Sequence, residues 1–156
     1  MAEENLKLVV FVLEHDSKVY EYGIPIQQVY EITRPQSTTK LPGMPAFVNG
    51  VMNLRRDVIP VVDIKERFCF GNTITQDTTR IIVVHINGKK CGILVDDVLE
   101  IIPIETEDVS EAPTIAGGVS ANFILGICKM NERLIIALDM DKILNQSEAQ
   151  ELQDVV

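Results

Sequence analysis

The side chains that could carry out chemistry in this 156-residue chain are few and poorly placed for it. His15 lies in a predicted turn and His85 in a predicted strand, and neither has a cysteine or carboxylate at metal-ligand spacing. Cys69 and Cys91 have no histidine nearby in the sequence that would activate them as nucleophiles. The pair Gly117-Gly118 precedes a predicted strand, whereas a phosphate-binding loop precedes a helix. We therefore expect no catalytic residue, no metal and no cofactor.

Acidic side chains form two clusters, which we considered as sites and rejected. Asp96, Asp97 and Glu100 are close together, and we interpret them as the solvated end of a strand. Residues 105–111 are rich in acids but lack the glycine and the alternating Asx spacing of a calcium-binding loop. A small chain without site chemistry is most often an interaction module.

The composition restricts the possible partners and the compartment. The chain has 14 Lys and Arg against 23 Asp and Glu, a formal charge of −9, which disfavours binding to nucleic acid or anionic lipid. The longest apolar run, residues 8–13, is far shorter than a membrane span, so we expect no direct membrane insertion. Three scattered cysteines favour reduced thiols and a cytoplasmic protein.

The elements that must position any functional surface are predicted to be mainly strands. Ile and Val together number 37, against 12 Leu and 7 Ala, and β-branched side chains favour the pleated surface of a strand. Apolar runs separated by short turns predict four hairpins: 6–13 with 18–24, 50–54 with 58–64, 80–86 with 90–95, and 123–129 with 133–140.

The remaining segments are assigned from spacing and turn signals. Residues 98–104 continue as a strand or as a helix followed by a strand, and residues 26–32 fit a short helix or an extended segment. Residues 105–111 are predicted to be a solvated loop, and 141–152 a short C-terminal helix with Asp141 as its N-cap. Short strands without crossover helices favour antiparallel barrels or a sandwich.

The chain also repeats itself. Glycine-containing and acid-containing blocks recur in the same order, first at an offset of 69 and then at 76; the pairs are 23–24 with 92–93, 29–32 with 98–101, 47–51 with 123–127, and 58–64 with 134–140. Hydrophobic hairpins resemble one another by nature, but the shared offset of Gly50 with Gly126 and of Asp63 with Asp139 favours a repeat. We predict one domain over 1–156, with interlocked repeat blocks at about 6–68 and 80–144. Two such small barrels should share an apolar interface.

Residues 53–63, Asn-Leu-Arg-Arg-Asp-Val-Ile-Pro-Val-Val-Asp, resemble the signature of the CheW family, the adaptor proteins of bacterial chemotaxis. Residues 22–24, 29–32, 47–51, 92–96 and 138–144 fit the same family, so the resemblance covers nearly the whole chain. It implies two SH3-like five-stranded antiparallel barrels on one hydrophobic core. It also implies a non-enzymatic adaptor that couples the cytoplasmic tips of chemoreceptors to the regulatory domain of a CheA-type histidine kinase, recruited from the cytoplasm to membrane receptor arrays.

Two other interpretations remain open at this point. One is an isolated β-barrel interaction module of another two-component sensory pathway. The other is a nucleic-acid-binding barrel, which the charge and the lack of a stacking platform disfavour, since the chain has five Phe, three Tyr and no Trp. We also see no nucleophile–base pair that would favour a small hydrolase.

The resemblance places partner-binding residues in the first repeat. Arg55 lies at the predicted tip of the hairpin, and Gly50 and Asn53 shape the strand beneath it. Val29 and Glu31 lie on the segment that faces receptor and kinase in the family. The alternatives are core packing for Val29 and plain solvent exposure for Glu31 and Arg55.

Three further candidates lie in the second half. Val98 and Ile101 correspond to Val29 and Ile32 and are expected either to line a groove for a receptor helix or to pack in the core. Ile115 is an isolated apolar residue in an acidic segment and is expected to be an exposed knob. Arg56 departs from the glycine usual in the family, which raises the question of how the turn presents Arg55.

Overall fold

The computed structural model describes residues 6–111, 115–116 and 119–143, and strands account for most of them. The first group of strands is β1 (Leu6–His15), β2 (Lys18–Pro25), β3 (Val29–Thr33), β4 (Val48–Leu54), β5 (Asp57–Asp63), β6 (Arg80–Ile86) and β7 (Lys89–Val95). The second is β8 (Asp97–Ile104), β9 (Val109–Ser110), β10 (Ile115–Ala116), β11 (Val119–Ser120), β12 (Ile124–Met130) and β13 (Arg133–Leu138). The expected mainly-β fold with four long hairpins is confirmed.

Helical structure in the described residues is limited to short turns. They are η1 (Ile26–Gln28), α1 (Ile64–Arg67), η2 (Thr106–Asp108), η3 (Ala121–Phe123) and η4 (Met140–Lys142). The expected loop at 105–111 therefore contains a 3-10 turn and the two-residue strand β9, which pairs with β12. Asp139, not Asp141, accepts the capping hydrogen bond at η4, and the rest of the expected C-terminal helix lies outside the described residues.

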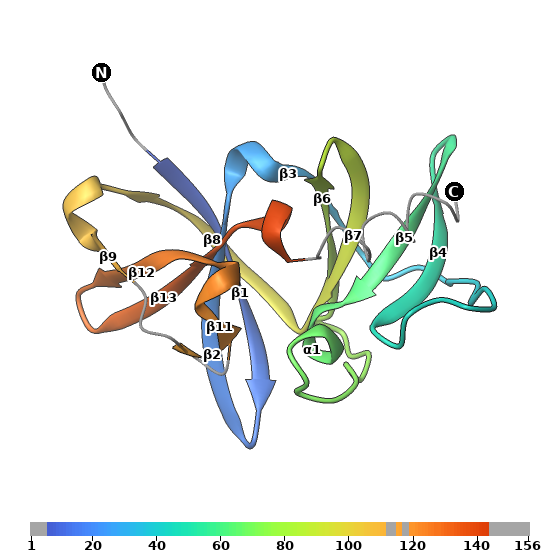
Figure 1. Cartoon of the computed structure of the whole chain (residues 1–156), viewed down its shortest axis with the longest axis horizontal. Coiled ribbons are helices and arrows are strands. Elements are labelled where there is room, and N and C mark those ends of the chain that lie inside the picture. The colour runs from blue at the N-terminus through green and yellow to red at the C-terminus, as the bar shows by residue number, and fades with distance from the viewer. Residues whose placement is uncertain (1–5, 112–114, 117–118, 144–156) are drawn as a thin grey trace.

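The long strands form two sheets, and each sheet takes strands from both halves of the chain. One has the order β3-β6-β7-β5-β4 and the other β8-β1-β2-β13-β12-β9 (Figure 1). The β1–β2 hairpin of the first half thus belongs to the sheet of the second half, joined through parallel pairing of β2 with β13. The β6–β7 hairpin is exchanged in the opposite direction, through parallel pairing of β7 with β5. The two repeats are therefore interleaved.

Apolar side chains fill three separate regions. One cluster lies within the six-stranded sheet and includes Leu8 and Ile135, and another lies within the five-stranded sheet and includes Val61 and Ile81. The largest contains residues of both sheets, such as the fully buried Phe11, and forms the expected shared core. Truncating a buried aromatic side chain to Ala typically lowers the free energy of unfolding by about 3–5 kcal/mol. Because residues of both sheets pack in this cluster, its packing stabilises the two sheets together.

Gly50 and Gly126 correspond in the two repeats, and each allows another segment of the chain to approach its strand closely. Each lies at a register shift in its strand, where another segment approaches closely. A Cβ on Gly50 would lie 2.8 Å from the backbone oxygen of Thr39, and one on Gly126 would lie 2.6 Å from Cγ1 of Val109. Any larger residue at either position would push the approaching segment away.

Candidate functional site

The two edges of the five-stranded sheet are connected by an ion pair between Arg55 and Glu31. Arg55 lies in the turn that joins β4 to β5, and Glu31 lies on β3, at the opposite edge of the sheet. The Arg55 guanidinium donates a hydrogen bond to Oε1 of Glu31. The Arg55 side chain is 68% exposed and that of Glu31 only 22%, so the arginine covers the carboxylate and faces solvent. This hydrogen bond, together with the negative charge of Glu31, raises the pKa of Arg55.

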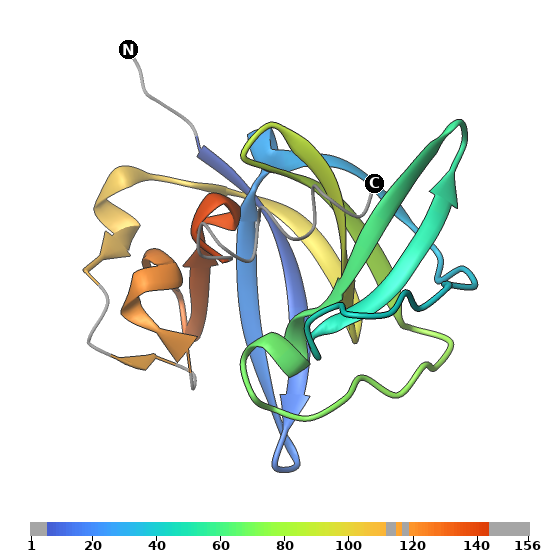
Figure 2. The ribbon, with the colours of Figure 1, turned by 45° about the vertical axis from the view of Figure 1, so that its right-hand side comes forward.

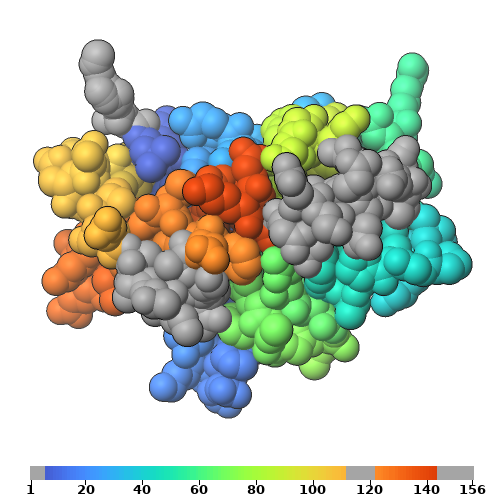
Figure 3. Space-filling view, in the orientation of Figure 1, coloured from blue at the N-terminus to red at the C-terminus, as the bar shows by residue number. Residues whose placement is uncertain are grey.

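The turn that presents Arg55 is tight and projects from the body of the molecule (Figures 2 and 3). Arg55 has a φ of 56°, in the left-handed region, which is uncommon for a residue other than glycine, asparagine or aspartate. Arg56, in contrast, does not have a positive φ. The arginine that replaces the usual glycine of the family is therefore accommodated, and the unusual backbone conformation belongs to Arg55 itself.

Two exposed apolar side chains extend this surface, and the sequence analysis did not identify them as binding residues. Tyr30 is 46% exposed and Ile32 is also exposed, one on each side of Glu31 along β3. The ammonium nitrogen of Lys90 lies 3.9 Å from the centre of the Tyr30 ring, a cation–π contact. An alternating strand pattern over β3 would have grouped Tyr30 with Ile32, but the spacing was also compatible with a helix. We call Tyr30, Glu31, Ile32 and Arg55 the β3 edge surface.

The second repeat has a related but different arrangement. Glu100 on β8 corresponds to Glu31. Its Oε2 lies 2.8 Å from a guanidinium nitrogen of Arg133 and forms an ion pair with it. Arg133 also forms a 2.6 Å ion pair with Glu21 on β2. Ile101, 52% exposed, occupies the place of Ile32, as the repeat predicts. The two edges thus share an acid paired with an arginine beside an exposed isoleucine.

The remaining predicted residues lie in different surroundings. Val29 and Val98 are partly buried and pack against the shared core. Asn53 is exposed on β4, and Gly50 is buried where Thr39 approaches. Ile115 begins the short strand β10, which pairs with β11, while its side chain lies outside what the structure describes. Among the predicted residues, the structure therefore brings Glu31 and Arg55 into direct side-chain contact.

The chemical groups of this surface suit recognition of another protein. In the part of the chain that the structure describes, no group of three or more His, Cys, Asp or Glu side chains is arranged to hold a metal ion. Burial raises the pKa of the Cys91 thiol to about 12 and is the main cause that raises the pKa of Cys128 to about 11, so both are protonated and unreactive at neutral pH. Arginine and tyrosine, both exposed on this surface, are enriched at protein–protein contacts.

The fold and the β3 edge surface together define a protein-interaction module made of two interleaved barrels. The model of the CheW-like domain matches residues 7–148, and the chain belongs to the CheW family of chemotaxis scaffold proteins. It is 32% identical to the chemotaxis protein CheW of Helicobacter pylori over 144 residues, 92% of this chain and 84% of that protein. It is 29% identical to CheW of Treponema pallidum over 98% of this chain and 90% of that protein.

A solved structure supports the same assignment. The scaffolding protein TtCheW from Thermoanaerobacter tengcongensis matches with a TM-score of 0.82 and 34% identity, over 93% of this chain and 91% of that chain. This likeness agrees with the SH3-like double barrel. Among the described residues, no helix is long and apolar enough to cross a membrane.

Proposed function

We propose that this chain is a non-enzymatic adaptor that couples chemoreceptors to a CheA-type histidine kinase. Its membership of the CheW family supports a role as a chemotaxis scaffold, and the exposed Arg55–Glu31 pair is the observation that carries the finer proposal. A guanidinium held by one carboxylate retains donors for a second acceptor, because it has five N–H groups. In this proposal the cytoplasmic tip of a receptor supplies that acceptor.

We assign the kinase to residues other than Arg55 and Glu31. Val29, beside the β3 edge surface, and Ile115, on β10, are the proposed contacts for the regulatory domain of the kinase. In the second repeat, the exposed Ile101 is the proposed apolar contact for a receptor helix, with Val98 supporting it from the core. The protein would act at receptor arrays on the cytoplasmic side of the membrane.

Reconstitution tests this proposal directly. Receptor-containing membranes and a CheA-type kinase are mixed with and without the purified protein, and kinase autophosphorylation is measured. The expected result is receptor-dependent activation that requires the protein and saturates with its concentration. Kinase activity unaffected by the protein at any receptor concentration would refute the adaptor role.

A calorimetric titration with magnesium ATP tests the non-enzymatic part of the proposal. No heat of binding is expected at micromolar protein, because the chain has no phosphate-binding loop in its sequence. Stoichiometric nucleotide binding would require a different function.

A further inference from the structure

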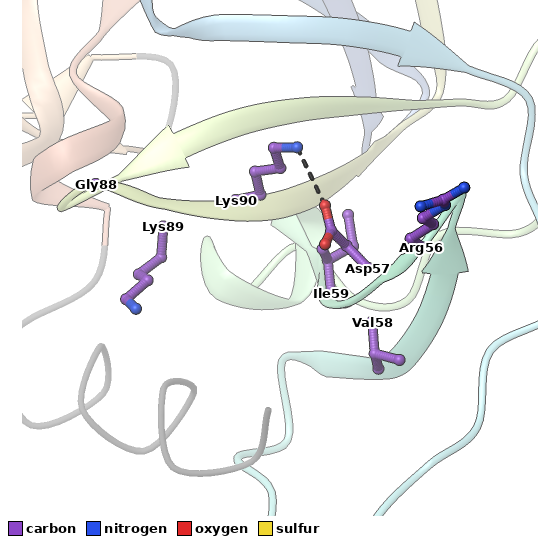
Figure 4. Close-up of a pocket in the computed structure, with 7 residues that line it drawn as sticks. All are labelled: Arg56, Asp57, Val58, Ile59, Gly88, Lys89 and Lys90. Atoms are coloured by element: carbon purple, nitrogen blue, oxygen red, sulfur yellow. Dashed lines mark hydrogen bonds and ion pairs between the residues drawn. The ribbon is translucent and has the colours of Figure 1, made fainter.

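A groove beside the β4–β5 hairpin is lined by none of the four residues of the β3 edge surface, although Lys90 in its wall contacts Tyr30. Its volume is about 630 Å³, and it lies between the start of β5 and the turn that joins β6 to β7 (Figure 4). Val58, which is 48% exposed, provides an apolar wall, and Gly88 leaves the opposite wall without a side chain. Three cations, Arg56, Lys89 and Lys90, line the same groove.

Only one of these cations is neutralised by a neighbouring acid. Nζ of Lys90 lies 3.2 Å from Oδ2 of Asp57, and this hydrogen bond is the main cause that raises the pKa of Lys90. Figure 4 shows Lys90 directed toward Asp57, with Lys89 directed away from both. Among the described residues, Arg56 and Lys89 form no ion pair. In a chain of formal charge −9, the groove therefore concentrates two unneutralised positive charges beside an apolar wall.

The second repeat shows that this positive charge is not a property of the fold. At the offsets of the repeat, Glu132 replaces Arg56 and Glu21 replaces Lys90. The corresponding ion pair is preserved with its signs exchanged, because Arg133 replaces Asp57. The hairpin arrangement recurs while the charges of these positions are reversed, so an acidic ligand that suits the groove of the five-stranded sheet is disfavoured at the equivalent place in the six-stranded sheet.

We propose that this groove binds an acidic segment of a partner protein, in which one apolar side chain lies between carboxylates. The carboxylates would contact Arg56 and Lys89, and the apolar side chain would pack against Val58 where Gly88 leaves space. Charge complementarity and the exposed apolar wall are the reasons for this choice of ligand. The proposal does not depend on receptor–kinase coupling, since none of the four residues of the β3 edge surface lines the groove.

The test uses fluorescence anisotropy with a labelled peptide of three Glu-Glu-Leu-Glu repeats and the full-length protein at low ionic strength. Matched peptides replace every Glu by Gln or every Leu by Ala. The protein variants are Arg56→Gly and Lys89→Gln, and the matched control is Lys18→Gln, which removes the same charge from an exposed position on β2. All of these side chains are exposed, so thermal melts should be unchanged.

Binding of the acidic peptide should weaken about two- to five-fold in each groove variant, as expected for the loss of one exposed ion pair. Lys18→Gln should have no such effect, and the Ala peptide should bind more weakly than the Leu peptide. Amide shifts in an NMR titration should cluster at Arg56, Val58 and Lys89. Equal losses in Lys18→Gln, or no difference between the Glu and Gln peptides, would overturn the proposal.

Three other occupants are distinguishable and would each overturn the proposal. Residues 144–156 contain three acids and no Lys or Arg. Changing those acids to amides should leave peptide affinity unchanged, whereas groove-dependent tightening would identify that segment as the occupant. Concentration-dependent self-association lost in Lys89→Gln would identify a second copy. Binding of a labelled single-stranded oligonucleotide, lost in the same variants, would identify nucleic acid.

Discussion

The contribution of Arg55 to coupling can be measured by replacing it with alanine. The Arg55 side chain is 68% exposed and contacts Glu31 at the surface, so its removal leaves no cavity. Exposed ion pairs contribute little to folding, and we expect the melting temperature to change by less than about 2 °C. Receptor-dependent kinase activation is expected to need about 10- to 150-fold more of the variant, the usual effect of losing a hydrogen bond to a charged group at an interface.

Companion variants separate a partner contact from a purely structural tie between β3 and the hairpin. Arg55→Lys should restore activation only in part, because an ammonium lacks the planar guanidinium. The double variant Glu31→Arg, Arg55→Glu keeps an ion pair between the same positions but removes the guanidinium from the tip. We expect this double variant to remain defective. The matched control Arg34→Ala removes an exposed arginine shortly after β3 and should behave like the unmodified protein.

Each unfavourable result has a definite meaning. Full activation by the exchanged pair would show that only the connection between β3 and the hairpin matters, and the partner-contact argument would be wrong. A large fall in the melting temperature of Arg55→Ala would show that Arg55 is structural. Unchanged melting with unchanged activation would remove this turn from the proposed site.

The other predictions concern the kinase contact, folding and the thiols. Ile115→Asp and Val29→Asp should each weaken kinase binding in a pull-down titration. Val29→Asp should also lower the melting temperature, because that side chain packs on the shared core. Normal kinase binding by both variants would show that the kinase contact lies elsewhere. Residues 1–72 and 73–156 expressed separately should not melt cooperatively, because each sheet needs strands from both halves, and a dispersed NMR spectrum from either half would contradict this. At pH 8, one thiol, the exposed Cys69, should react rapidly with a disulfide reagent, and the two buried cysteines with raised pKa values should react only on unfolding.

Local structure could be predicted from the sequence because its determinants are local. The dipeptide Asn87-Gly88 takes positive φ at both residues, as its composition predicts for a two-residue hairpin turn. The pairing of one hairpin with another could not be predicted in the same way. The parallel pairing of Ile135 with Glu21 joins residues far apart in the chain, and no turn signal marks it. The sequence analysis predicted interlocked repeats, but the identity of the hairpins exchanged between the two sheets became evident only from the sheet order.

For the candidate site, too, individual residues could be predicted from the sequence, but the contacts between them could not. Arg55 and Glu31 were each predicted from the family motif, but nothing in the sequence indicated that the two side chains meet. Tyr30 and Ile32 were missed because residues 26–32 begin as a 3-10 turn and continue as a strand, so neither a helical nor an extended period fits the whole segment. A strand prediction limited to residues 29–33 would have marked Tyr30 and Ile32 as the more exposed positions of β3.

The repeat also has a consequence for how partners are oriented. Two barrels with equivalent edges would offer a partner two equally good places to bind, because the exposed isoleucines Ile32 and Ile101 correspond. The polar residues remove this ambiguity. The five-stranded sheet carries Asp57 with Lys90, and the six-stranded sheet carries the opposite arrangement, Arg133 with Glu21. A charged partner placed on the wrong barrel would meet like charges, which is a common way to enforce specificity between similar surfaces. Exchanging the signs of an ion pair thus distinguishes the two barrels while the paired hairpins keep the same arrangement.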